Sequence, residues 1–168
     1  MLSSLSSTGN DPSQPYVLAV ASHKGGTGRT TAALALAWCW GQSGLQTLLV
    51  DADPVPAARL VATGPDGRCP WPNVRILPTL PKSGESMPRA DLIVVDCPPL
   101  TEPGARQVLR RADGVLLTTQ TELLALRTTP SATYALQVAQ AERPNLELVG
   151  MIVAAFDVLD PLHNEMLA

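Results

Sequence analysis

The sequence has no excess of positive charge, because 12 lysines and arginines stand against 15 aspartates and glutamates over 168 residues. A chain with a formal net charge of −3 has no overall attraction to a polyanion, so contact with nucleic acid would require a local basic patch. Its three cysteines are too few and too irregularly spaced for a disulfide framework or a CxxC metal site. Their scarcity favours a reducing compartment, and we expect the cytoplasm.

Long apolar runs are also missing. No window reaches the roughly 18 unbroken apolar residues of a membrane span. Residues 1–15 have neither a basic start nor an apolar core, so they do not resemble a secretory signal and are expected to form a disordered tail. With 45% hydrophobic residues, the rest of the chain is long enough for one domain with a real core and too short for two. We therefore expect a single domain over residues 16–168.

Short apolar segments alternate with segments that favour helix, which predicts an α/β fold. Residues 91–96 carry four successive apolar side chains without alternation, as in a parallel strand covered on both faces. The expected strands cover residues 16–21, 46–50, 73–77, 91–96, 114–120 and 146–157. The expected helices cover residues 31–38, 54–62, 101–113 and 121–142, the last broken or kinked at Pro130.

A glycine-rich stretch from Ala21 to Thr31, Ala-Ser-His-Lys-Gly-Gly-Thr-Gly-Arg-Thr-Thr, joins the first expected strand to the first expected helix. Glycines permit positive φ and close backbone approach, so successive N–H groups can point at phosphate oxygens at the helix N-terminus. Such a turn can be purely structural, but its place between strand and helix favours phosphate binding. The plain G-x-x-x-x-G-K-[ST] pattern fails, since His23 replaces its first glycine and Arg29 its lysine.

Carboxylates follow two other expected strands. Asp51-Ala-Asp-Pro54 ends one of them, and Asp96-Cys-Pro-Pro99 ends another. Ligands of open α/β sheets bind at the carboxyl ends of strands, and a carboxylate there can hold Mg²⁺, usually through a water. The alternative for the first group is the capping of the helix that follows it.

Three segments in this order resemble the ParA/MinD superfamily of partition and positioning ATPases. Residues 24–31 resemble its deviant Walker A box, K-G-G-x-G-K-[ST]-T, residues 51–54 its D-x-D-P segment, and residues 96–99 its D-x-P-P segment. The resemblance implies a P-loop NTPase-type three-layer sandwich with a mostly parallel central sheet, which binds ATP or ADP with Mg²⁺. The implied nucleotide-binding residues are Lys24, Gly25, Gly26, Thr27, Gly28, Arg29, Thr30 and Thr31.

The resemblance also implies individual roles. Thr30, Asp51 and Asp96 would hold the metal. Lys24 and Asp53 would be catalytic: Lys24 would reach the phosphates of the partner in a nucleotide-bound homodimer, and Asp53 would position the attacking water. The implied task is plasmid or chromosome partition, or the positioning of another cargo, with non-specific DNA at the nucleoid and a ParB-like activator as partners.

Several positions depart from the family pattern. Arg29 keeps a positive charge but has a longer, planar head than lysine, which predicts slow ATP hydrolysis or none. Val55 replaces a frequent glutamine, and Ala154 replaces a Thr or Asn near the adenine, while the domain is short at its C-terminus. A catalytically degenerate interaction module or regulator of an intact ATPase is therefore the alternative. A MinD-like membrane role would need a basic amphipathic helix, which the acidic end of the chain does not offer.

Overall fold

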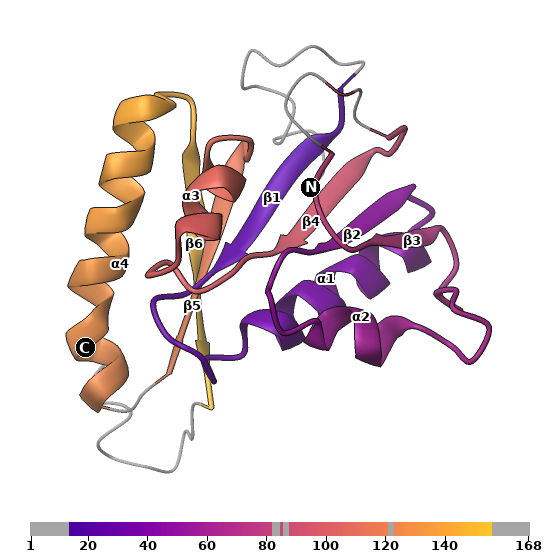
Figure 1. Ribbon diagram of the computed structural model, residues 1–168, viewed down its shortest axis with the longest axis horizontal. Helices are drawn as coiled ribbons and strands as arrows, with labels where there is room; N and C mark the ends of the chain where they lie inside the picture. Colours follow the sequence, from indigo (N-terminus) through magenta and orange to yellow (C-terminus); the bar gives the residue numbers. More distant parts are fainter. Residues whose placement is uncertain (1–13, 82–84, 86–87, 121–122, 156–168) are drawn as a thin grey trace.

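The computed structural model describes residues 14–81, 85, 88–120 and 123–155, shown in colour in Figure 1. Residues 1–13 of the expected tail lie outside the described residues, and so do residues 156–168. The elements in chain order are β1 (Tyr16–Ala21), α1 (Arg29–Gln42), β2 (Thr47–Asp51), α2 (Ala57–Ala62), β3 (Val74–Leu77), β4 (Leu92–Asp96), α3 (Pro103–Leu109), β5 (Gly114–Gln120), α4 (Leu123–Glu142) and β6 (Glu147–Ala154).

The strands form one six-stranded sheet in the order β3-β2-β4-β1-β5-β6, and neighbouring strands are parallel throughout. Helices α1 and α2 bury apolar side chains against one face, while α3 and α4 cover the other. Figure 1 shows these helices on either side of the twisted sheet. The predicted α/β three-layer sandwich is confirmed. No helix within the described ranges is long and apolar enough to cross a membrane.

Strand β4 shows why apolar and polar residues do not alternate over residues 91–96. Ile93 packs in the core beneath α3 and α4, and Val94 packs in the core beneath α1 and α2. Since successive side chains of a strand point to opposite faces, a strand at the centre of a covered sheet needs apolar residues at every position. Both side chains are fully buried.

Helix boundaries differ from the sequence prediction. Helix α1 begins at Arg29 and continues to Gln42, so it is longer at both ends than predicted, while α2 begins only at Ala57, behind Pro54 and Pro56. Of the predicted break or kink at Pro130, the break is wrong, because α4 passes through this proline as one helix of 20 residues, while the kink stays a prediction. A proline removes one helical hydrogen bond, and the remaining turns of a long helix hold the axis together.

A test of packing uses Gly41, in the last turn of α1. Alanine usually stabilises a helix relative to glycine. Here a Cβ atom would collide with the carbonyl oxygen of Pro72 and lie 2.5 Å from Val74 Cγ2. We therefore expect Gly41→Ala to lower the free energy of unfolding by about 1–3 kcal/mol, the usual cost of overpacking, as measured by urea denaturation.

The control is Ala35→Gly on the exposed face of the same helix, which should cost only the propensity difference of about 1 kcal/mol. A more stable Gly41→Ala protein would contradict the close approach of α1 to the segment before β3.

Candidate functional site

The loop between β1 and α1 has the backbone geometry of an anion-binding turn. Gly26 and Gly28 adopt φ of +80° and +81°, a conformation that other residues rarely accept. Gly28 is the N-cap of α1, so the free N–H groups of the helix start face the same side as the loop. No other part of the described chain lies within 4 Å of a Cβ atom built on Gly25 or Gly26. The loop therefore leaves room for a ligand against its backbone.

Side chains at the end of β5 hold this loop in place. The hydroxyls of Thr27 and Thr118 lie 3.0 Å apart, and Gln120 Nε2 donates to the carbonyl oxygen of Gly26 at 2.6 Å. Ser22 Oγ donates to the carbonyl oxygen of Lys24 at 2.8 Å. Sequence reasoning missed Thr118 and Gln120. Their signal is the run of polar residues that closes an otherwise apolar strand.

Ala154, at the end of β6, lies directly against the loop. A Cβ atom built on Gly28 would be 3.1 Å from Ala154 Cβ. Small residues are therefore needed on both sides of this contact. The contact places Ala154 beside the glycine loop, and its predicted position near the adenine stays a prediction.

The strand ends bring the predicted carboxylates together. Asp51 and Asp96 occupy paired positions on β2 and β4, and both are buried. Asp51 Oδ2 accepts a hydrogen bond from the backbone N–H of Arg59 in α2 at 2.7 Å, and Asp53 Oδ1 accepts one from Val55 N–H at 2.9 Å. Asp51 therefore also caps α2, because it accepts a backbone N–H from the first turn of this helix, as the helix-capping alternative predicted.

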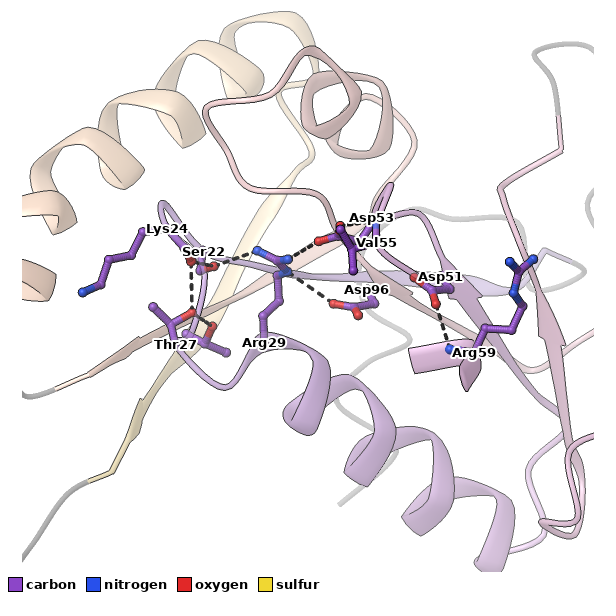
Figure 2. Close-up of polar contacts among 10 residues, drawn as sticks. Ser22, Lys24, Thr27, Arg29, Asp51, Asp53, Val55, Arg59 and Asp96 are labelled. Carbon is purple, nitrogen blue, oxygen red and sulfur yellow. Dashed lines mark hydrogen bonds and ion pairs between the residues drawn. The ribbon is translucent and has the colours of Figure 1, made fainter. Parts of the chain in front are cut away.

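Arg29, the first residue of α1, inserts its guanidinium between the carboxylates. Its Nε donates to Asp96 Oδ1 at 3.3 Å, and its Nη2 forms an ion pair with Asp53 Oδ2. Its Nη1 donates to Ser22 Oγ at 3.1 Å. Only 8% of the Arg29 side chain is exposed. The structure thus places this side chain against the predicted water-positioning and metal-binding aspartates, as Figure 2 shows.

Electrostatics at Asp96 reflect this burial. The pKa of the Asp96 carboxyl lies above its usual value, mainly because burial removes its hydration. The negative charge of Asp51 raises this pKa further. A hydrogen bond from Thr30 and the positive charge of Arg29 oppose the shift. Two buried oxygens, Asp51 Oδ1 and Asp96 Oδ2, have no hydrogen-bond partner among the described residues. Carboxylate oxygens suit Mg²⁺, but the other oxygen of Asp96 is already bound to a guanidinium.

The remaining predicted residues lie on the loop and the first turn of α1. Thr30 is beside Asp96, and Thr31 is exposed on the helix. Figure 2 shows Lys24 directed away from Arg29 and the aspartates, on the outer side of the loop. The structure therefore brings Arg29, Thr30 and the three aspartates into one cluster and leaves Lys24 outside it.

The buried ion pairs of Arg29 can be tested by their contribution to stability. Arg29→Ala would leave Asp53 and Asp96 without their cation. Removal of one partner of a buried pair costs about 3–5 kcal/mol, so we expect a loss of this size in the free energy of unfolding, measured by urea denaturation. The control, Arg106→Ala, removes an exposed pair with Glu142 and should cost about 0–1 kcal/mol. Equal losses in the two variants would contradict the buried cluster.

Comparisons with known proteins agree with this geometry. The profile of the CobQ/CobB/MinD/ParA nucleotide binding domain matches residues 18–168. The chain is 30% identical to the chromosome-partitioning ATPase Soj of Thermus thermophilus over an alignment of 172 positions, gaps included, which covers 83% of this chain and 69% of Soj.

Two solved structures share the fold. Cobyrinic acid a,c-diamide synthase from Mycobacterium smegmatis, with a bound ATP analog and magnesium, has a TM-score of 0.73 at 23% identity and covers 92% of this chain and 80% of its own. The septum site-determining protein MinD from Pyrococcus horikoshii, complexed with Mg-ADP, has a TM-score of 0.64 at 20% identity, with coverage of 91% and 77%. From the profile match, the identity to Soj and the strand-end cluster, we conclude that the chain belongs to the CobQ/CobB/MinD/ParA family of nucleotide-binding domains and is a ParA/MinD-type, ATPase-like protein.

Proposed function

We propose that this chain binds ATP and ADP at the loop between β1 and α1 and acts as a ParA-like protein in plasmid or chromosome partition, or in the positioning of another cargo. The observation that carries the proposal is the loop itself, with two glycines in the left-handed region at the N-terminus of a helix of 14 residues. The similarity to Soj supports the partition role.

The arrangement supports a division of labour among the residues. The backbone N–H groups from Gly25 to Thr31 receive the phosphates, in the field of the N-terminus of α1. Lys24 lies on the outer side of the loop, and this position supports the proposal that Lys24 reaches the phosphates of a second molecule in a nucleotide-dependent homodimer. The proposed partners of the domain, residues 16–168, are a ParB-like activator and DNA bound without sequence specificity. Its proposed location is the cytoplasm, at the nucleoid.

Hydrolysis in this protein is slow. Asp53, the residue proposed to position the water, forms an ion pair with Arg29 through Oδ2 and accepts a hydrogen bond from Val55 N–H at Oδ1, so both of its oxygens already have a partner and the attacking water must compete with them. A bound Mg²⁺ would neutralise phosphate charge during transfer, with Thr30, Asp51 and Asp96 as its ligands. The ion pair of Arg29 with Asp96 opposes this use of Asp96. The same cluster is the observation that favours the second candidate, a degenerate interaction module that binds nucleotide without turnover.

Calorimetric titration with ATP and with ADP is the direct test of the nucleotide site. We expect saturable binding by the unaltered chain. Lys24→Ala removes the cation proposed to reach the phosphates bound by the second molecule of the dimer, so the affinity should fall by about tenfold or more, the size of a lost charge-assisted hydrogen bond.

The matched control is Arg68→Ala, which removes an exposed cation outside the site and should leave the affinity unchanged. Absence of binding in a folded sample would contradict the proposed nucleotide site. The chain would then be an interaction module that works without a nucleotide.

The effect of Arg29 on turnover is a second test. Lysine has a compact head that cannot span Asp53 and Asp96 as the guanidinium does, so Arg29→Lys should free Asp53. We expect the steady-state ATPase rate to rise by about 10²-fold, the size of one well-placed electrostatic contact in a transition state.

Arg68→Lys serves as the control for the same chemical change at an exposed position. An unchanged rate in Arg29→Lys would show that the guanidinium does not limit hydrolysis, and would favour the degenerate module.

A further inference from the structure

Arg29 is a cation that the chain itself supplies to the carboxylates at the strand ends. Its guanidinium bonds to side chains from three segments, namely Asp96 at the end of β4, Asp53 after β2 and Ser22 at the start of the loop. Figure 2 shows it between the loop and the aspartates. A metal ion in a nucleotide site joins protein carboxylates to phosphate oxygens, and a cation bound to the carboxylates next to the loop can form the same kind of bridge.

We infer that Arg29 takes the place of the divalent cation in nucleotide binding, so that this chain binds ATP with the same affinity with and without Mg²⁺. The inference deepens the proposed function and rests on the nucleotide site proposed at the loop.

The hydrogen-bond capacity of the guanidinium permits this role. Arginine has five N–H donors and keeps its charge at all ordinary pH values. The three contacts to Asp96, Ser22 and Asp53 use one hydrogen each on Nε, Nη1 and Nη2. One hydrogen therefore remains on each terminal nitrogen. The guanidinium thus keeps donors on both terminal nitrogens for phosphate oxygens, with which arginine forms charge-assisted hydrogen bonds.

Charge explains why Mg²⁺ adds little. The ion would share Asp96 with a guanidinium that is already bound at Oδ1, and two cations so close together repel each other. Mg²⁺ also keeps several waters in a strict octahedral shell. The oxygens left for it, Asp51 Oδ1 and Asp96 Oδ2, are both buried at paired positions of β2 and β4. Arg29 has none of these requirements, because the fold holds it in place before nucleotide arrives.

Calorimetric titration of the unaltered chain with ATP, once in magnesium chloride and once in EDTA, tests the inference. We expect the two dissociation constants to agree within about twofold, less than the contribution of a single hydrogen bond. A loss of affinity in EDTA would overturn the inference and assign a metal site to Asp51 and Asp96. Absence of ATP binding in both buffers would overturn the proposed function itself, so the two failures are distinguishable.

Arg29→Lys assigns the effect to this residue. In this variant the carboxylates lose the bridging guanidinium, so ATP binding should become magnesium-dependent, with about tenfold weaker affinity in EDTA. Arg68→Lys should remain indifferent to the metal. If the ATP affinity of Arg29→Lys depends on Mg²⁺ no more than that of the unaltered chain, Arg29 does not replace the divalent cation. Circular dichroism of each variant confirms that the compared proteins are folded.

Discussion

Buried carboxylates need a counter-charge, and in this protein the counter-charge comes from the first residue of the helix that follows the glycine loop. Asp96 is fully buried and Asp53 nearly so, and one guanidinium serves both. The start of α1 and the ends of β2 and β4 are thereby tied together. Because an unpaired buried charge is far more costly than an exposed one, this cluster constrains how the loop, the helix and the two strands can be placed.

The loop depends on a second set of contacts, from the opposite side. Polar side chains at the end of β5 bond to Thr27 and to the carbonyl of Gly26, and Ala154 of β6 packs beside Gly28. The parallel arrangement of the sheet brings all these strand ends to one edge. The loop backbone is thus held between aspartates on one side and β5 and β6 on the other, which is the preorganisation that a phosphate site requires.

The family fold and the chemistry of the site can be separated here. A six-stranded parallel sheet with the loop after β1 is what the solved relatives share with this chain at low sequence identity. The chain adopts that fold with Arg29 at the motif's lysine position, and in this chain the guanidinium is the cation that pairs with Asp53 and Asp96. Folds tolerate such exchanges because the functional chemistry depends on a few side chains at the strand ends.

Short apolar runs determined most of the strands, since a sheet covered on both faces needs apolar side chains at every position of its central strands, as in β4. Chain order was likewise sufficient to predict that Asp51 and Asp96 lie at the carboxyl ends of strands in one sheet. Helix limits near prolines were less predictable, as α2 and α4 show, because a proline restricts local geometry without deciding whether packing carries the helix onward. The roles of Thr118 and Gln120, and above all the direction of the Arg29 side chain, were decided only by tertiary structure. The contacts of Thr118 and Gln120 with the loop, and that of Arg29 with Asp96, join residues 67 to 94 positions apart, and no local pattern records which of the available partners a long polar side chain will meet.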